Sequence, residues 1–472
     1  MTPEFAILGH PNEGKSSVLS TLAEDDSVRV SATPGETTEC RTFPVVIDGR
    51  EVLRFTDTPG FQNPARVLSE LKKRTLTDEN PLATFRAYAA TIPELHDDCE
   101  LLGPVARGAG IIYVVDGSRP IRNVDRAEME ILRLTGKPRM AIIICKEGAD
   151  NALDAWKTEF RKNFNANRVF NAHRATYAER ILLLEALKAI DQDWHEALSE
   201  VITAFKKDWA ARNSATVDAI VSLLSDSLSL QLSDNIGAEK EAEEARRKLF
   251  LSYSEAISRM EAKAHQRIRS LYKHNIFTYD LPPHSILNKD LFDEQTWQLL
   301  GLTRQQVIIA GGLGGAAIGA GLEMAAFGHG LGLFTAVGTL AGALGALFGG
   351  ENIADKMKIL GLPLGGKKVQ IGPAKSIDLL FILLNRSLLY YQHTINWAHG
   401  RRNYKKDQAI DLPQLYDAPP QGFTQNWSAG KIKICHDFFK AIRNDKADQG
   451  QKAVEKFREL LLTTMQQISE SE

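Results

Sequence analysis

The stretch Gly9-His10-Pro11-Asn12-Glu13-Gly14-Lys15-Ser16-Ser17 decides the fold of the N-terminal part of this chain. The apolar run from Phe5 to Leu8 precedes it, and a helix-forming run from Ser17 to Ala23 follows it. A strand, a glycine loop and a helix with the spacing G-x-x-x-x-G-K-S are typical of a phosphate-binding loop. Its backbone amides and the helix N-terminus favour bound phosphate.

Each residue of this loop has an expected role. We expect Lys15 to reach the β- and γ-phosphates of a nucleotide and the Ser16 hydroxyl to bind Mg²⁺. The loop residues expected to contact the nucleotide are Gly9, Asn12, Glu13, Gly14, Lys15, Ser16 and Ser17.

The composition excludes several classes of protein. The chain has 472 residues, enough for two or three domains, and a net charge of −2, which gives no general attraction to nucleic acid. The four cysteines are scattered, so neither a zinc site nor a disulfide framework is indicated. The scattered cysteines fit a reducing cytosol. We expect no signal peptide, because the N-terminus leads directly into the first strand.

The next residues predict a mostly parallel sheet flanked by helices. Thr42 to Ile47 and Arg50 to Phe55 predict a hairpin, and the second strand leads into Asp57-Thr58-Pro59-Gly60. An aspartate followed by a glycine at a strand end suits a Mg²⁺ site and an amide that senses the γ-phosphate. The runs 111–116 and 140–145 read as buried parallel strands, with a helix over 124–135 between them.

These motifs resemble those of the bacterial GTPases of the Era and TrmE type over residues 1–190. The resemblance lies in G-x-P-N-x-G-K-S at 9–16, P-G-x-T at 34–37 and D-T-P-G at 57–60. It implies a GTP/GDP site in which Gly14, Lys15 and Ser16 hold phosphates and metal. Thr37 matches the switch I threonine that closes on Mg²⁺, and Asp57 and Gly60 match the switch II pair. The resemblance thus makes Lys15, Thr37 and Gly60 the expected catalytic residues.

One further position matches the family pattern, and another departs from it. Asn12 matches the asparagine that binds K⁺ in TrmE-like members. Phe61 stands where Ras-like enzymes have a water-positioning glutamine, and a phenyl ring cannot orient water by hydrogen bonding. Hydrolysis would then depend on phosphate electrostatics, a bound cation or another group. We expect His96, Asp97 and Asp98 to lie on a solvated helix face.

The guanine-reading motif N-K-x-D is degenerate in this chain. After the strand at 140–145 the chain reads Cys145-Lys146-Glu147-Gly148-Ala149-Asp150. Lys146 matches, whereas the asparagine is replaced by Cys145, and the aspartate is either displaced to Asp150 or replaced by Glu147. In the last base-contacting turn only Ala172 matches. Guanine specificity is therefore implied by the family more than by the residues.

The remainder of the chain predicts an all-α region with a glycine-rich helical hairpin. We expect a G domain over 1–190, a helical arm over 191–300, the hairpin over 301–352 and a C-terminal helical region over 353–472. Apolar spacing predicts long amphipathic helices between 194 and 273 and another over 453–468. The apolar helix that starts at 376, with its aromatic and then basic continuation to 406, fits either a membrane interface or a core.

Residues 307–350 contain 14 glycines, and only Glu323 and His329 are ionisable. Gly311, Gly315 and Gly319 recur at the four-residue spacing that lets helices pack closely in lipid. Two pieces of about 20 residues are each long enough to span a bilayer. We expect this hairpin to insert with both ends cytoplasmic. The alternative is a buried hairpin in a soluble domain.

The leading hypothesis is a GTP-binding switch with slow, cation-assisted hydrolysis on the cytoplasmic face of the inner membrane. Its helical arm would bind a protein effector or a second copy of the chain. One alternative is a soluble, cytoplasmic ribosome-assembly or RNA-modification GTPase, although the sequence contains no RNA-binding motif. Another is a nucleotide-bound scaffold without turnover.

Overall fold

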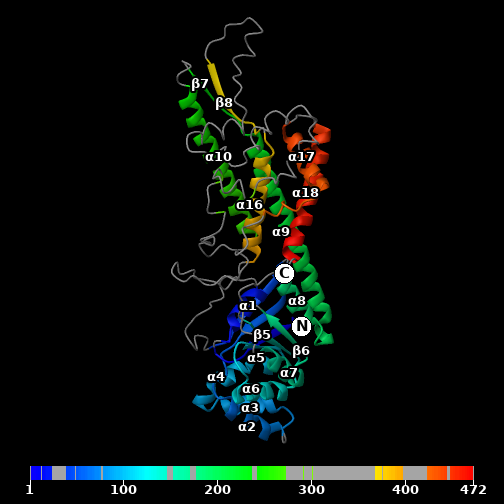
Figure 1. The fold of residues 1–472 in the computed structure, drawn as a ribbon. Helices are drawn as coiled ribbons and strands as arrows, with labels where there is room; N and C mark the ends of the chain where they lie inside the picture. The colour runs from blue at the N-terminus through cyan, green and yellow to red at the C-terminus, as the bar shows by residue number, and fades with distance from the viewer. Residues whose placement is uncertain are drawn as a thin grey trace. The chain divides into compact units, whose positions relative to one another are not determined.

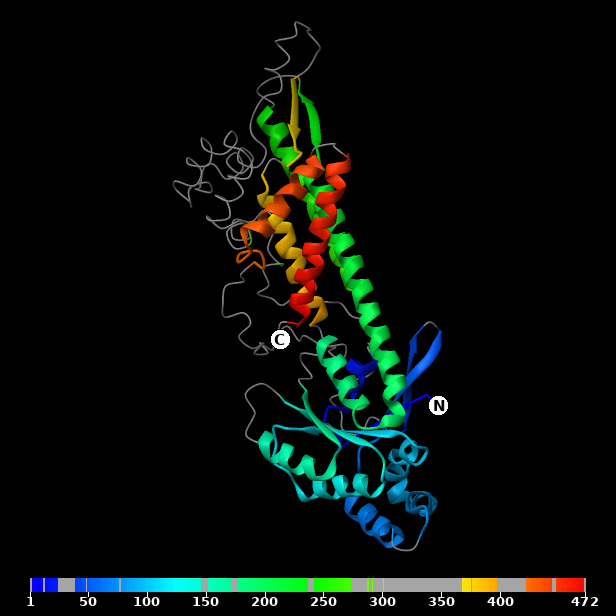
Figure 2. The same ribbon diagram turned by 90° about the vertical axis from the view of Figure 1, so that its right-hand side faces the viewer.

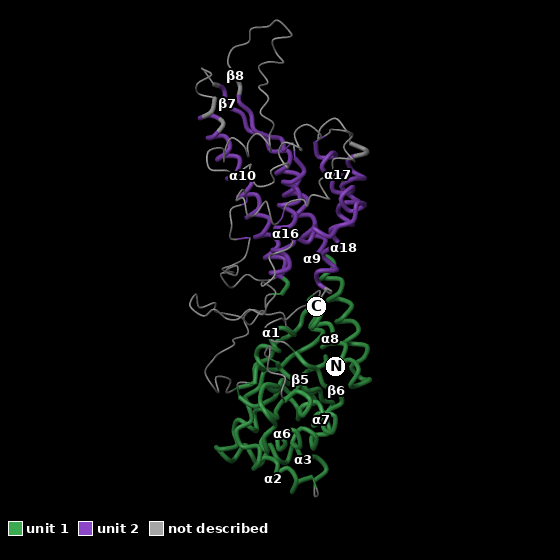
Figure 3. The backbone as a smooth tube through the Cα atoms, viewed as in Figure 1, with its two compact units in different colours: residues 1–211, 273–278, 395–408 green, residues 212–272, 279–394, 409–472 purple. Residues whose placement is uncertain are grey.

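The structure is a computed structural model of the chain, and its elements carry the labels of Figure 1. It describes residues 2–11, 13–23, 39–47, 49–75, 78–145, 152–170, 177–236, 242–272, 287, 291, 300, 367–374, 376–396, 422–443 and 447–470. The chain divides into two compact units (Figure 3). Unit 1 comprises residues 1–211, 273–278 and 395–408, and unit 2 comprises residues 212–272, 279–394 and 409–472.

Unit 1 is built on a six-stranded, mainly parallel sheet. Its strands are β1 (Glu4–Leu8), β2 (Arg41–Ile47), β3 (Arg50–Asp57), β4 (Gly110–Asp116), β5 (Arg139–Ile144) and β6 (Ala166–Phe170). They follow the order β2-β3-β1-β4-β5-β6, in which β2 runs antiparallel to β3 and the other neighbours are parallel. The predicted hairpin and the two predicted apolar strands are confirmed.

Helices connect these strands or follow the last of them, and helices lie on both sides of the sheet (Figure 2). They are α1 (Lys15–Ala23), α2 (Pro64–Thr75), α3 (Pro81–Ala89), α4 (His96–Leu101), α5 (Gly103–Ala106), α6 (Asn123–Leu134), α7 (Leu153–Asn163), α8 (Tyr177–Lys188) and α9 (His195–Ser229), with short 3-10 helices at Pro93–Leu95 and Gln192–Trp194. The predicted α/β architecture of this part is thus confirmed.

Alternate residues of the strands face two separate apolar cores. Ala6 and Leu8 of β1 pack into the core that also receives α2, α3, α6 and α7. Phe5 and Ile7 pack into the opposite core with α1, α8 and the first part of α9. Because both faces of a parallel sheet are covered, its inner strands consist of continuous apolar runs. The parallel register also brings the C-terminal ends of β1, β3 and β4 to one edge of the sheet.

Unit 2 is mainly helical, as predicted. It contains residues 212–229 of α9 together with α10 (Ala242–Leu271), α16 (Asp378–Ile395), α17 (Ala429–Arg443) and α18 (Ala447–Glu470). A two-stranded antiparallel sheet, formed by β7 (Leu232–Ile236) and β8 (Lys367–Ile371), was not indicated by the sequence. Residues 237–366 separate the two strands in the chain, so their pairing could not be recognised from a turn motif between them.

Helix α16 decides between the two interpretations of the apolar segment that starts at residue 376. Every residue from Leu379 to Leu388 is buried, which is typical of a helix in the centre of a bundle. Its buried Arg386 is paired with Glu261 of α10, with Nε and Oε1 2.5 Å apart. The described part of this segment is therefore a core helix.

The predicted glycine-rich hairpin at 301–352 lies outside the described residues. Among the helices within the described ranges, none is both long and apolar enough to cross a membrane.

Candidate functional site

The phosphate-binding motif forms the loop that joins β1 to α1. Gly9 has a φ of +150°, and a Cβ at this position would lie 2.3 Å from the Val114 carbonyl oxygen, so the close approach of the two strand ends requires glycine. Lys15 begins α1 and points back over the loop. Its Nζ donates hydrogen bonds to the carbonyl oxygens of Gly9 at 3.2 Å and His10 at 3.1 Å.

The lysine lies in an acidic environment. Burial lowers the pKa of Lys15, and the carboxylates of Asp57, Glu128 and Glu13 act in the opposite direction. These carboxylates favour the charged ammonium that a phosphate requires. Ser16 follows in the first turn of α1 and is half-buried.

The Asp57-Thr58-Pro59-Gly60 segment lies directly beside the phosphate loop. Asp57 ends β3 next to Ile7 of β1, and the Thr58 hydroxyl donates a 2.7 Å hydrogen bond to the Ile7 carbonyl oxygen. A Cβ on Gly60 would lie 2.5 Å from Cδ of Pro11 in the phosphate loop. The structure therefore brings together the two motifs that the sequence assigned to phosphate binding and γ-phosphate sensing.

The side chain of Phe61 lies in the apolar core. It is 1% exposed and belongs to the core that contains Val67 and Leu71 of α2. The residue in the glutamine position therefore anchors the start of α2. That Phe61 does not orient water stays a prediction.

The expectation that Asp98 lies on a solvated helix face is wrong. Its relative exposure is 0%, and its two carboxylate oxygens accept hydrogen bonds from the backbone amides of Gln62 at 3.0 Å and Asn63 at 3.1 Å. Burial raises the pKa of Asp98 to about 6, although these amide bonds lower it. The sequence could not show this, because the amides come from a segment more than 30 residues away.

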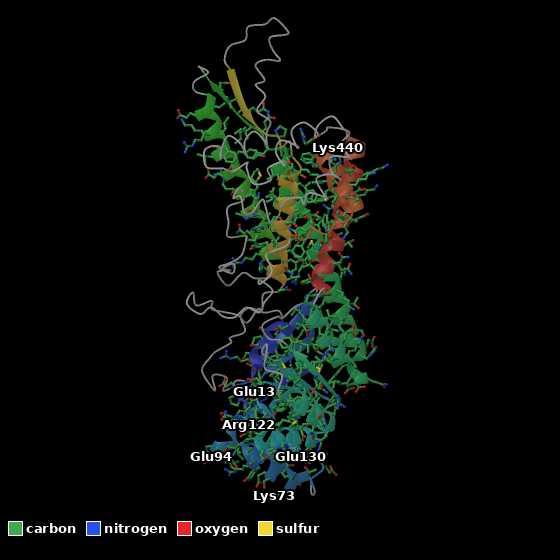
Figure 4. All side chains as sticks on the ribbon, viewed as in Figure 1. Glu13, Lys73, Glu94, Arg122, Glu130 and Lys440 are labelled. Carbon is green, nitrogen blue, oxygen red and sulfur yellow. The ribbon has the colours of Figure 1, made fainter. Side chains whose placement is uncertain are left out.

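An ion cluster around two buried carboxylates involves the glutamate of the phosphate loop. Glu13 accepts a 2.9 Å hydrogen bond from Nε of Arg119, which also binds Asp125 at 2.7 and 2.9 Å. Arg122 lies 3.6 Å from Glu13 and 3.1 Å from Asp125 (Figure 4 labels Glu13 and Arg122). Burial raises the pKa of Glu13, and the hydrogen bond from the Asp116 amide and the arginine oppose this effect.

No sequence motif indicated Arg119, Arg122 or Asp125. One feature of the sequence did indicate that Glu13 has a basic partner. A carboxylate inside a phosphate-binding loop repels the phosphates unless a cation neutralises it, so Glu13 required a basic partner. The structure shows that its side chain is engaged with Arg119. We therefore expect Glu13 to contribute to nucleotide binding through its backbone.

His10 connects the loop to a second buried carboxylate. Its Nδ1 lies 3.0 Å from Oε1 of Glu128 on α6, and the Tyr113 hydroxyl donates to Oε2 of the same residue at 2.8 Å. Glu128 and Tyr113 are both 0% exposed. Helix α6 thus supports the loop directly through Glu128 and indirectly through Asp125, which binds the arginine that pairs with Glu13. The sequence pattern of α6 gave no indication of either contact.

Comparison with known protein families identifies the two parts of the chain. A model described as a domain of unknown function (DUF3482) matches residues 157–463, more than half of the chain. The chain belongs to this family. A second model, described as a 50S ribosome-binding GTPase, matches residues 4–146, so this DUF3482 protein carries a GTPase-family domain at its N-terminus.

Three known proteins are similar to parts of this chain. The DUF3482 protein is 26% identical over 214 residues to a probable GTP-binding protein EngB of Acidobacterium capsulatum, which covers 44% of this chain and 87% of the relative. It is 30% identical over 120 residues to GTPase Der of Agathobacter rectalis, which covers 24% of this chain. The chain spans only 27% of that relative's length. A crystal structure of Era with MgGDPNP and part of 16S ribosomal RNA is 19% identical, with a TM-score of 0.27, and covers 40% of this chain and 57% of that one.

Several predicted site residues of this DUF3482 protein lie outside the described residues. They are Asn12, Thr37, Lys146, Asp150 and Ala172. Their roles in binding K⁺, Mg²⁺ and the guanine base stay predictions. The described residues of the site place Gly9, Glu13, Gly14, Lys15, Ser16, Ser17, Asp57 and Gly60 around the contact between the phosphate loop and the end of β3.

Proposed function

We propose that this chain binds GTP and GDP in its N-terminal domain and hydrolyses GTP slowly. The main observation that supports this proposal is the contact of Gly60 with Pro11. Because the segment that follows β3 touches the phosphate loop, a γ-phosphate bound there would contact this segment, whereas GDP would not. The site could in this way report which nucleotide is bound. This is the property that a switch protein requires.

The described residues also suit Mg²⁺. The Ser16 hydroxyl and the Asp57 carboxylate are oxygen donors of the kind this ion prefers, and the family resemblance adds Thr37. When bound, Mg²⁺ would neutralise negative charge on the β- and γ-phosphates. Lys15 would act on the same phosphates from the start of α1. Ser16 and Asp57 would hold the ion directly or through water.

Hydrolysis without a glutamine requires another source of stabilisation. We propose that K⁺ at Asn12 supplies part of it, because a cation beside the phosphates opposes the charge that develops in the transition state. Phosphate release by the purified chain should then be faster in K⁺ than in Na⁺ at equal ionic strength. Asn12→Ala should remove the difference, and Lys15→Ala should abolish release. Equal rates in both salts would contradict the role of K⁺, and no release above the Lys15→Ala background would favour a scaffold without turnover.

Two observations favour different sites of action. The glycine pattern of residues 307–350 favours a bilayer, where the helical region would bind an effector or a second copy of the chain. The family description of the N-terminal domain favours a ribosomal subunit. Cell fractionation with carbonate extraction, followed by sedimentation of the soluble pool, separates these proposals. Chain that resists extraction supports the membrane switch, and chain that sediments with ribosomal subunits supports the second candidate.

A further inference from the structure

The segment that contains Gly60 is held at two points. On its N-terminal side, the Thr58 hydroxyl donates to the carbonyl oxygen of Ile7 in the central strand β1. On its C-terminal side, the amides of Gln62 and Asn63 donate to the carboxylate of Asp98. Each holding point lies two or three residues from Gly60. The position of Gly60 beside the phosphate loop is therefore fixed from both directions.

The second holding point is made by a part of the chain that none of the recognised motifs includes. Asp98 lies on α4, between Phe61 and β4, and its side chain is completely buried. Asn63 strengthens the connection, because its side-chain Nδ2 donates a 2.7 Å hydrogen bond to the Glu94 carbonyl oxygen (Figure 4 labels Glu94). Asp98 is thus a buried carboxylate whose two oxygens are both used on the segment after Gly60.

We propose that Asp98 is a positioning residue for recognition of the γ-phosphate. Its carboxylate holds the amides of Gln62 and Asn63 and thereby places the Gly60 amide where it can reach a γ-phosphate in the loop. This inference rests on the proposed GTP binding. It goes beyond it by assigning the discrimination between GTP and GDP to a residue outside the phosphate-binding motifs.

The proposal predicts an effect that a merely structural residue would not have. Loss of the Asp98 carboxylate weakens binding of a triphosphate, which Gly60 contacts, and leaves binding of GDP unchanged. A residue that only stabilised the fold would affect both nucleotides together. The selectivity between the two nucleotides is therefore the decisive quantity.

The ionisation of Asp98 allows a second, independent test of its role, through the pH dependence of nucleotide selectivity. Two amide donors are best satisfied by an ionised carboxylate, because protonation turns one of its two acceptor oxygens into a hydroxyl, which accepts a hydrogen bond more weakly. Burial, followed by the nearby charge of Asp97, raises the pKa of Asp98 to about 6, while the amides of Gln62 and Asn63 lower it. Of the other charged groups on adjacent elements, Arg86 of α3 donates to the Cys99 carbonyl oxygen, and Arg66 of α2 pairs with Glu94.

The direction of the pH effect is set by the ionisation of the Asp98 carboxylate. The carboxylate is ionised above about pH 6, so the selectivity for a γ-phosphate is present at pH 7.5 and is lost as the pH falls through about 6. Beryllium fluoride suits this measurement, because it occupies the γ-phosphate position beside GDP and carries no titratable proton. The ratio of GDP affinities with and without beryllium fluoride should fall between pH 7.5 and pH 5.5.

The test compares Asp98→Asn with Asp97→Asn, its half-buried neighbour on the same helix, in the full chain with Mg²⁺. Titration with fluorescent GDP and a non-hydrolysable GTP analogue should show about a tenfold loss of triphosphate affinity in Asp98→Asn, since a tenfold change corresponds to about one charge-assisted hydrogen bond. GDP affinity should stay within about twofold, and Asp97→Asn should resemble the wild type.

Three outcomes would show whether Asp98 positions Gly60 for recognition of the γ-phosphate. Equal losses for GDP and the triphosphate in Asp98→Asn, or no loss for either, would overturn the inference while the proposed function stands. If Asp98→Asn does not fold, the wild-type pH profile decides, and a selectivity that is the same at pH 5.5 and pH 7.5 overturns the inference. If the wild-type chain binds neither nucleotide, the proposed function itself fails, and this inference fails with it.

Discussion

Replacing Gly60 with alanine would separate the two motifs that meet at the phosphate loop. The new Cβ would lie 2.5 Å from Cδ of Pro11 and 2.6 Å from both Cγ and the backbone nitrogen of the same residue. An ordinary contact begins near 3.4 Å, so one of the two segments must move by about 0.9 Å, the difference between 3.4 and 2.5 Å. The proline ring and a backbone nitrogen cannot rotate away as a flexible side chain would. The overpacking should cost about 1–3 kcal/mol of stability.

The effect on chemistry should be larger than the effect on stability. A misplacement of about 1 Å can reduce a rate by about 100-fold, and we expect a loss of that order in GTP hydrolysis by Gly60→Ala. GDP affinity should fall less than the rate of hydrolysis, because GDP lacks the phosphate that Gly60 would contact. The matched control is Gly103→Ala, where the new Cβ would meet its nearest neighbour, a side-chain nitrogen of Arg86, at an ordinary 3.4 Å. The reasoning is refuted if Gly60→Ala hydrolyses GTP at the rate of Gly103→Ala.

Two further predictions concern the ion cluster and the base. Arg119→Met would leave the buried carboxylates of Glu13 and Asp125 without their main partner and should destabilise the N-terminal domain by about 3 kcal/mol in urea titrations. Arg133→Met, which breaks a half-exposed surface pair, should cost less than about 1 kcal/mol, and equal costs for the two variants would contradict the assigned importance of the cluster. Selectivity for GTP over ATP should be modest, because Cys145 replaces the asparagine of the guanine motif and leaves the base edge incompletely paired. A competition titration that shows a preference of several orders of magnitude would disprove this.

Much of the N-terminal fold could be predicted from local patterns. The strands β4 and β5 are continuous apolar runs, and a buried parallel strand requires such a run regardless of its neighbours. The phosphate loop and the Asp57-Thr58-Pro59-Gly60 motif were recognised because their glycines and charged residues keep a fixed spacing. Their proximity then followed from the rule that parallel strands bring their C-terminal ends to one edge.

The contacts that shape the site from outside the motifs could not be predicted in this way. The burial of Asp98 depends on its contact with the backbone amides of residues 62 and 63, which lie far from it in the sequence. The pairing of Glu13 with Arg119 joins residues 106 positions apart. Neither contact leaves a periodic pattern, since each involves a single buried carboxylate at one position of the chain. In the sequence alone such residues look like ordinary surface charges, which is why the expectation for Asp98 was wrong.

The central claim is that the loop from Gly9 to Ser17 binds the phosphates of GTP. The most direct test is an equilibrium titration of the full chain with fluorescent GTP and Mg²⁺, comparing wild type, Lys15→Ala and Lys162→Ala. Lys162 is an exposed lysine of α7 that pairs with Glu159, so its removal controls for the loss of one positive charge. We predict that Lys15→Ala loses binding by at least about 100-fold, because it removes the charge that reaches the β- and γ-phosphates, whereas Lys162→Ala binds like the wild type. Unchanged affinity in Lys15→Ala would contradict the account.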